Sequence, residues 1–180
     1  MGLDMYLTAK VYVGAKYRAV KQNYIEVADL YGGMDKDNAD FKDCKLYPTS
    51  NISHISYDIG CWRKVNWIHK WFVDNVQDGN DDCEEYEVSS ELLDKLDSTC
   101  RTILDKFCKV KNGKDRTALI DYINDKLPPQ SGPFFGSTDP KDKDELDYYR
   151  DSLYDTLGII KRAKSYIEKF GAYIYYQSSW

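Results

Sequence analysis

The chain of 180 residues has the length of one domain and carries a formal net charge of −5 at neutral pH. Apolar residues make up 42% of it and the mean hydropathy is −0.64, and no apolar run approaches the roughly 20 residues that a bilayer span needs. We therefore expect a soluble protein with a hydrophobic core and no membrane partner. The interleaving of basic with acidic residues argues against nucleic acid as the main partner.

The cysteines indicate reduced thiols. Their number, five, is odd and no two stand at C-x-x-C spacing, which argues against a disulfide framework and against a zinc site. The first residues lack the basic region, apolar run and cleavage site of a secretory signal. These features predict a cytoplasmic protein with no metal and no cofactor.

The N-terminal part begins with an alternating pattern. Apolar and polar residues alternate from position 2 to 13, which predicts a half-buried strand. Residues 14–31 indicate a short helix that two glycines end. The polar, turn-rich stretch 32–51 predicts an excursion from the core that is mobile and serves as a lid or partner-contact loop. A second strand is expected over 52–59 from its isoleucine and tyrosine content.

The stretch 61–76, CWRKVNWIHKWFVDNV, predicts the central helix and contains three of the four tryptophans. Four apolar residues recur at the spacing of one buried helical face: Val65, Ile68, Phe72 and Val76. A second stripe beside it is formed by Trp62, Asn66, His69 and Val73. Two stripes indicate a helix that packs on more than one side.

Three more helices are expected after a short strand near 86–88. Val88 and Leu93 have the spacing of a hydrophobic staple around Ser89, which predicts the start of a helix that continues to about residue 107. A third helix is expected over about 115–126, because two prolines at 128 and 129 stop it.

The last helix is the longest by its three- and four-residue apolar repeat. Asp139 is the expected N-cap, with Pro140 at the first helical position, and Phe170 and Gly171 close it. The tail AYIYYQSSW predicts a strand paired with residues 2–10. The sequence therefore predicts a single α+β domain over 1–180, with a small sheet that pairs the N- and C-terminal strands and about four helices packed on it.

Four residues of the predicted central helix form the first candidate ligand site: Arg63, Lys64, Asn66 and His69. An arginine offers a forked donor to phosphate or carboxylate, an asparagine can bind an amide or a ribose, and a histidine can transfer a proton. The set favours a phosphate-bearing ligand and makes His69 the candidate for a catalytic acid or base. The alternative is that the asparagine and histidine are hydrogen-bonded residues at the edge of the core and the basic pair is solvated.

Gly136 and Ser137 form a second candidate site. A Gly-Ser-Thr turn that leads into a helix presents free backbone N–H groups, which favour an anion. The acidic residues that follow would repel a phosphate, and a capping role already explains Asp139. The acidic turn at 78–82 lacks the oxygen spacing of a calcium loop.

The sixteen tyrosines are many for this length and several lie near the C-terminus. Tyrosine and tryptophan are favoured at protein interfaces. A tyrosine-rich strand would suit a homo-oligomer, and equally a core with polar edges.

Five motifs resemble those of a family of small proteins encoded by tailed bacteriophages and prophages. They are the opening MGLDMYL, the core WRKxNxIHxWFV, the turn DGxDDC, the loop PFFGSTD and the final YYQSSW. The resemblance implies expression in the cytoplasm of a bacterial host and an accessory rather than a virion role, with no established activity to carry over. By analogy with other small phage proteins, it implies binding of host proteins or of nucleotides, including host defence signals.

These observations leave three functional hypotheses. The first is a phage-encoded accessory protein that binds a phosphate-bearing small molecule, such as a nucleotide or a host defence signal, or a host protein. The second is a nucleotide- or nucleic-acid-modifying enzyme in which His69 acts as acid/base and Arg63 holds phosphate. The third is a non-catalytic oligomeric interaction module.

Overall fold

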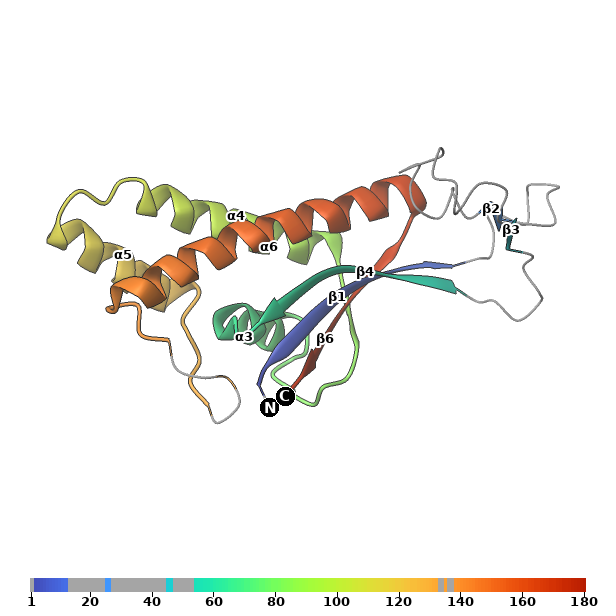
Figure 1. Ribbon diagram of the computed structural model, residues 1–180, viewed down its shortest axis with the longest axis horizontal. Helices are drawn as coiled ribbons and strands as arrows, with labels where there is room; N and C mark the ends of the chain where they lie inside the picture. The colour runs from blue at the N-terminus through green and yellow to red at the C-terminus, as the bar shows by residue number, and fades with distance from the viewer. Residues whose placement is uncertain (1, 13–24, 27–44, 47–53, 133–134, 136–137) are drawn as a thin grey trace. The chain divides into compact units, whose positions relative to one another are not determined.

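The computed structural model describes residues 2–12, 25–26, 45–46, 54–132, 135 and 138–180 (Figure 1). The chain divides into two compact units, Met1–Lys10 with Tyr57–Trp180, and Val11–Ser56. In the smaller unit the strands β2 (Ile25–Glu26) and β3 (Lys45–Leu46) pair antiparallel. A strand therefore replaces the expected helix at 25–26. The rest of that expected helix, and the expected excursion apart from β3, lies outside the described residues.

A four-stranded antiparallel sheet organises the larger unit, in the order β4-β1-β6-β5. The strands are β1 (Asp4–Tyr12), β4 (His54–Arg63), β5 (Tyr86–Val88) and β6 (Tyr173–Ser179). The pairing of β1 with β6 aligns Leu7 with Tyr176, which confirms that the N- and C-terminal strands join in one sheet. On the other side of β1, the N–H of Lys64 donates to the carbonyl of Leu3 at 2.8 Å, just beyond the end of β4.

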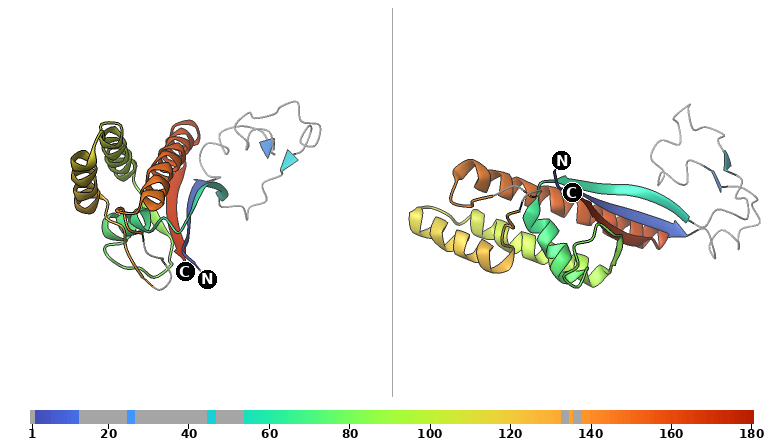
Figure 2. Two further views of the ribbon diagram at one scale, coloured as in Figure 1. Left: turned by 60° about the vertical axis from the view of Figure 1, so that its left-hand side comes forward. Right: turned by 90° about the horizontal axis from the view of Figure 1, so that it is seen from below.

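The two faces of the sheet differ as the alternating sequence predicts. Figure 2 shows the described helices on one side of the sheet. The buried side chains of the two central strands belong to that face: Leu3, Met5, Leu7, Ala9, Ile174, Tyr176 and Ser178. The opposite face carries Tyr6, Tyr173 and Gln177, which are exposed.

Helix α3 spans Asn66–Asn75, so the prediction that the helix begins at Cys61 is wrong. Residues up to Arg63 belong to β4, and Lys64 breaks the strand with a positive φ of 58°. The helical spacing from Val65 onward was correct, but Trp62 is buried from a strand. Its indole Nε1 donates to the Thr156 hydroxyl at 3.0 Å. Trp62 is a buried strand residue that stands just before a buried helix in the sequence. It therefore continues the apolar pattern of α3 although it is not helical.

Helices α4 (Ser90–Phe107) and α5 (Gly113–Lys126) follow β5. The predicted cap is confirmed, because the Ser89 hydroxyl accepts from the N–H of Leu92 at 3.3 Å. The staple residues Val88 and Leu93 are both buried. Helix α5 begins slightly earlier than expected, because the Asn112 side chain accepts from the N–H groups of residues 114 and 115.

Helix α6 (Lys143–Phe170) has Asp142 as its N-cap, so the prediction that Asp139 caps it is wrong. The Asp142 carboxylate accepts from the N–H groups of residues 144 and 145, whereas Asp139 accepts from the N–H of Lys141 in the preceding turn. Both aspartates meet the sequence preference for a cap, so the preference alone cannot choose between them. Gly171, in the left-handed region with φ 61°, ends the helix as predicted.

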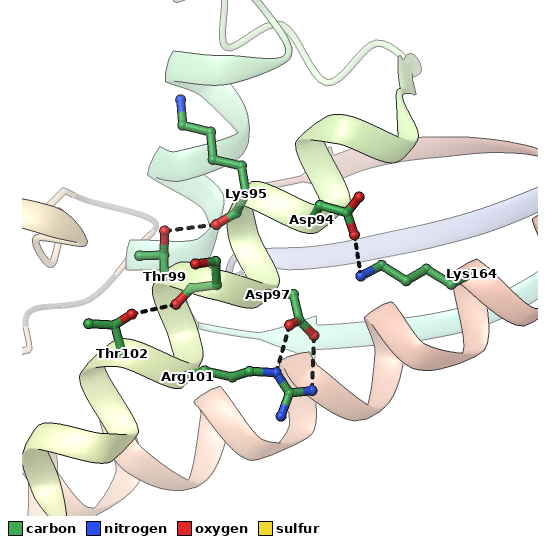
Figure 3. Close-up of polar contacts among 8 residues, drawn as sticks. Asp94, Lys95, Asp97, Thr99, Arg101, Thr102 and Lys164 are labelled. Carbon is green, nitrogen blue, oxygen red and sulfur yellow. Dashed lines mark hydrogen bonds and ion pairs between the residues drawn. The ribbon is translucent and has the colours of Figure 1, made fainter.

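Helix α6 packs against α4, and α4 also packs against α5. Lys164 of α6 forms an ion pair with Asp94 of α4, and Arg101 makes a bidentate pair with Asp97 one turn away within α4 (Figure 3). Exposed pairs of this kind contribute only about 0–1 kcal/mol each. The buried apolar stripes of the two helices therefore account for most of their association.

Candidate functional site

The structure separates the four candidate residues of the first predicted site. Asn66 and His69 lie on α3 and have no solvent exposure. Arg63, the last residue of β4, and Lys64, in the turn that follows, are exposed. The four side chains therefore do not form one helical ligand face. Gly136 and Ser137, the second predicted site, lie outside the described residues.

Asn66 holds a neighbouring loop against the start of α3. Its side-chain carbonyl accepts from the N–H of Gln130 at 3.0 Å. Its amide nitrogen donates to the carbonyl of Phe135 at 3.3 Å and lies 3.4 Å from the Thr138 hydroxyl. Both ends of the amide are engaged with protein groups, which is the expected state of a buried polar side chain.

His69 joins α3 to the last strand and to the turn after α3. Its Nε2 lies 3.0 Å from the Asp81 carboxylate, and its Nδ1 lies 2.8 Å from the Tyr176 hydroxyl. Because a carboxylate only accepts, Nε2 carries the proton, and in the neutral imidazole Nδ1 accepts from Tyr176. Burial, reinforced by the charge of Asp81, raises the pKa of Tyr176 well above its ordinary value, so the hydroxyl remains a donor.

Aromatic and polar side chains surround His69 and exclude solvent from it. The second Asp81 oxygen accepts from the Trp180 indole at 3.0 Å. The Phe135 ring lies 5.0 Å from the imidazole centroid and meets Trp180 edge-on. Both imidazole nitrogens are occupied and the side chain is inaccessible to solvent. This arrangement serves as a structural clasp and gives no support to proton transfer to a bound substrate.

Arg63 and Lys64 lie on the surface. The Arg63 Nε is 3.7 Å from the Asp4 carboxylate, and its side chain is 77% exposed. Its backbone carbonyl accepts from the Tyr148 hydroxyl of α6 at 2.7 Å. Burial, followed by the charge of Asp155, raises the pKa of Tyr148, which keeps the phenol protonated as that donor.

A shallow groove of about 630 Å³ lies elsewhere in the larger unit, between β4 and α6. Ten residues line it: Tyr6, Asp58, Ile59, Gly60, Cys61, Tyr154, Asp155, Gly158, Ile159 and Arg162. None of them is among the site residues predicted from the sequence. The available signal was the pair of glycines, one at the end of an expected strand and one inside an apolar helical repeat, where glycine needs a packing reason.

The two glycines shape the groove in different ways. A β-carbon on Gly60 would come within 2.4 Å of the Ile159 side chain, so the strand touches the helix directly there. A β-carbon on Gly158 would meet only the Arg162 guanidinium, at 3.9 Å. Gly60 therefore sets the close approach of β4 to α6, whereas Gly158 leaves space open.

The groove follows an edge of the sheet, because β4 has a neighbour on one side only. The Arg162 Nε donates to the outward carbonyl of Ile59 at 2.8 Å. Together with the bond from Tyr148 to Arg63, this covers the edge at two points four residues apart. Side chains that cover an edge in this way prevent uncontrolled strand pairing.

The groove carries three charges, two carboxylates and one guanidinium. Among the described residues, none of the ion pairs involves Asp58, Asp155 or Arg162. Tyr6 and Tyr154 stand in the same lining and are 42% and 54% exposed. The groove therefore offers unpaired charge of both signs, with an excess of negative charge, next to two aromatic rings.

No helix in the described part of the chain is long and apolar enough to cross a membrane. Within the same residues, no three histidine, cysteine, aspartate or glutamate side chains are grouped as metal ligands. No family model, no curated protein and no solved structure matches this chain.

Proposed function

We propose that this chain is a bacteriophage accessory protein that acts in the cytoplasm of the bacterial host by binding a host protein. The observation that carries the proposal is the groove, which brings together a strand edge that is covered at only two points, two tyrosine rings and charges without ion-pair partners among the described residues. Surfaces of this kind recognise extended polypeptide through main-chain hydrogen bonds and side-chain contacts. Capture of a defence protein would make the role an anti-defence one.

The resemblance to small proteins of tailed phages supports the setting in a bacterial host. It rests on motifs at both ends and in the middle of the chain. Three of these motifs meet in the structure: His69 of the core motif and Trp180 of the final motif both bond to Asp81 of the turn motif. The resemblance therefore includes residues that hold the fold together. In this proposal the groove, and not these residues, binds the partner.

The charges favour a protein over a phosphate-bearing small molecule. The groove sets two carboxylates, Asp58 and Asp155, against the single guanidinium of Arg162, so a phosphate of charge near −2 would meet net repulsion. Arg63 and Lys64, the expected phosphate donors, are not among its lining residues. A nucleotide-like ligand thus has less support than a polypeptide.

The test is an affinity capture from host lysate with two matched variants at one position. Gly158→Trp fills the groove, whereas Gly158→Ala adds only a β-carbon with no contact closer than 3.9 Å. We expect a host protein to be retained by the wild type and by the alanine variant and to be lost with the tryptophan variant. Equal retention by all three proteins, with unchanged circular dichroism, would contradict the proposal.

An oligomeric interaction module is the second candidate. It is favoured by the tyrosines on the sheet face away from the helices, where Tyr6 and Tyr173 are 42% and 50% exposed. Light scattering of the purified chain over a hundredfold concentration range tests it. A second species that disappears in Tyr173→Ser, a variant outside the groove lining, would support self-association, and a constant monomer mass would contradict it.

A further inference from the structure

On the outer edge of β4, Cys61 lies between two residues, Ile59 and Arg63, whose backbone carbonyls accept hydrogen bonds from side chains of α6. In an antiparallel strand, the N–H and C=O of one residue point the same way, and the direction alternates along the chain. Ile59 and Arg63 both direct their carbonyls outward, to Arg162 and Tyr148. Cys61, midway between them, therefore also directs its N–H and C=O outward, and it lines the groove.

The spacing of the covered carbonyls limits what can pair there. Four residues of strand span about 13 Å at the usual rise of about 3.3–3.4 Å per residue. Only a short extended segment fits between the Arg162 and Tyr148 side chains. Full-length pairing of β4 with β4 of a second copy would require both of these hydrogen bonds to break.

The charges around Cys61 define the side chains of such a segment. Asp58 and Asp155 present carboxylates without a cationic partner among the described residues, one from each wall of the groove. The one cation of the lining, Arg162, donates its Nε to the Ile59 carbonyl, and the carboxylates outnumber it. Tyr6 and Tyr154 add ring faces, which attract ammonium and guanidinium groups. A lysine or arginine in the segment would meet both kinds of group, whereas an acidic segment would meet repulsion.

We propose that the groove binds a short extended peptide segment of a partner protein, which pairs with the backbone of Cys61 and places a lysine or arginine between Asp58 and Asp155. The inference rests on the proposed function and specifies the chemistry of the partner. The backbone bonds supply the alignment, and the carboxylates select basic over acidic sequences.

The test uses three synthetic pentapeptides with a terminal fluorescein. The first is Val-Lys-Val-Lys-Val, the second replaces both lysines by glutamate, and the third is the lysine peptide with alternate backbone nitrogens methylated. Fluorescence anisotropy gives the affinity, and amide chemical shifts in isotope-labelled protein locate the contact. We expect binding of the lysine peptide alone, with shifts at Gly60 and Cys61.

Two double variants that remove the same number of charges distinguish recognition of lysine by the groove carboxylates from the effect of the net charge of the protein. Asp58→Asn with Asp155→Asn should weaken the lysine peptide by about 3–10-fold, with the salt dependence of exposed ion pairs. Asp105→Asn with Asp121→Asn, at exposed positions of α4 and α5, removes the same charge and should leave the affinity unchanged. The inference would be overturned if both double variants changed the affinity for the lysine peptide equally. It would also be overturned if the glutamate or methylated peptide bound equally well, or if the amide chemical shifts changed elsewhere in the protein.

The inference and the proposed function can fail separately. If a host protein is lost with Gly158→Trp while no lysine peptide binds, the groove binds a protein and the proposed chemistry is wrong. If the lysine peptide binds at Cys61 while no host protein depends on Gly158, the chemistry holds and the proposed partner is wrong.

Discussion

The Tyr176 hydroxyl and the His69 imidazole meet at 2.8 Å in the interior, 107 residues apart in the sequence. The Tyr176 ring also stacks on Phe72 at a centroid distance of 3.9 Å. Helix α3 and strand β6 are therefore joined by one polar and one aromatic contact of the same side chain. A change that removes only the hydroxyl separates the two contributions.

Tyr176→Phe should lower the free energy of unfolding by about 1–3 kcal/mol, because it keeps the ring stack and leaves a buried imidazole nitrogen without its partner. Urea unfolding followed by tryptophan fluorescence measures the change. Tyr154→Phe, at a tyrosine that is 54% exposed, is the control and should stay within about 0.5 kcal/mol of the wild type. Equal midpoints for both variants would show that the buried bond contributes nothing.

Gly60→Ala should destabilise the fold by roughly 1–3 kcal/mol, because its β-carbon would overlap the Ile159 side chain. The double variant with Ile159→Ala should lose less stability than the sum of the two single variants, since the smaller side chain relieves the overlap. Thermal or urea unfolding of the four proteins completes the cycle. Strict additivity would mean that the two residues do not contact each other.

Gly158→Ala should raise the free energy of unfolding, whereas Gly60→Ala should lower it. The position lies inside α6, and an added β-carbon meets only the Arg162 guanidinium at 3.9 Å. Replacing a mid-helix glycine by alanine gains about 0.5–1 kcal/mol. A loss of stability in the same unfolding assay would show that the helix or the groove is more crowded there than described.

Stability should fall at alkaline pH, from about pH 9 through the Cys100 thiol, whose pKa burial raises from 9.0 to about 12, and above pH 10 through two buried tyrosines. Burial raises the pKa of Tyr149 and of Tyr176 well above the ordinary value of 10.0. Because the folded pKa exceeds the unfolded one, their contribution is complete below pH 10. It is lost as the pH rises towards the folded values, since only the unfolded phenols then ionise. Each such tyrosine can reduce the free energy of unfolding by up to about 1.4 kcal/mol per pH unit.

Urea unfolding between pH 8 and 11 measures this dependence. Tyr149→Phe removes one of the two buried phenols and should reduce the slope above pH 10, even though it also loses the 2.9 Å bond to the carbonyl of Leu127. Its effect below pH 9 should be a constant offset. An unchanged alkaline slope would contradict the assignment of the pH dependence to this phenol.

Exposed cysteine thiols should be alkylated faster than buried ones. Burial raises the pKa of Cys100 to about 12, so its thiolate is scarce at neutral pH, whereas Cys61 and Cys108 are exposed. Mass spectrometry after brief treatment with iodoacetamide should find Cys61 and Cys108 alkylated and Cys100 intact until urea is added. Rapid alkylation of Cys100 in the folded protein would place it outside the core.

The sequence predicted the elements whose signals are local. The alternation in residues 173–179 gave the two faces of β6, and the positions of Ser89 and Gly171 marked helix ends correctly, because caps act within one turn. The start of α3 was wrong because Trp62 is buried by tertiary contacts from β4. The Lys64 backbone, which ends that strand, has a left-handed φ that its residue type does not predict.

The candidate site was harder to predict for the same reason. Asn66 and His69 were correctly recognised as polar residues within an apolar pattern, but the groups that satisfy them come from distant segments. The groove combines residues 58–61 with residues 154–162 and one side chain of β1. No local pattern links these segments, since their proximity depends on how α6 crosses the sheet.

The place of β6 in the sheet constrains the order of folding. It lies between β1 and β5, and it is the neighbour that connects β5 to the rest of the sheet. The contacts of β1 with β6 close a loop of more than 160 residues, whereas α4 and α5 adjoin in sequence. Distant pairings form late because loop closure costs entropy before any contact rewards it. We expect the α4–α5 hairpin to acquire hydrogen-exchange protection first and the central strands last, so that the His69 clasp and the groove form in the final step.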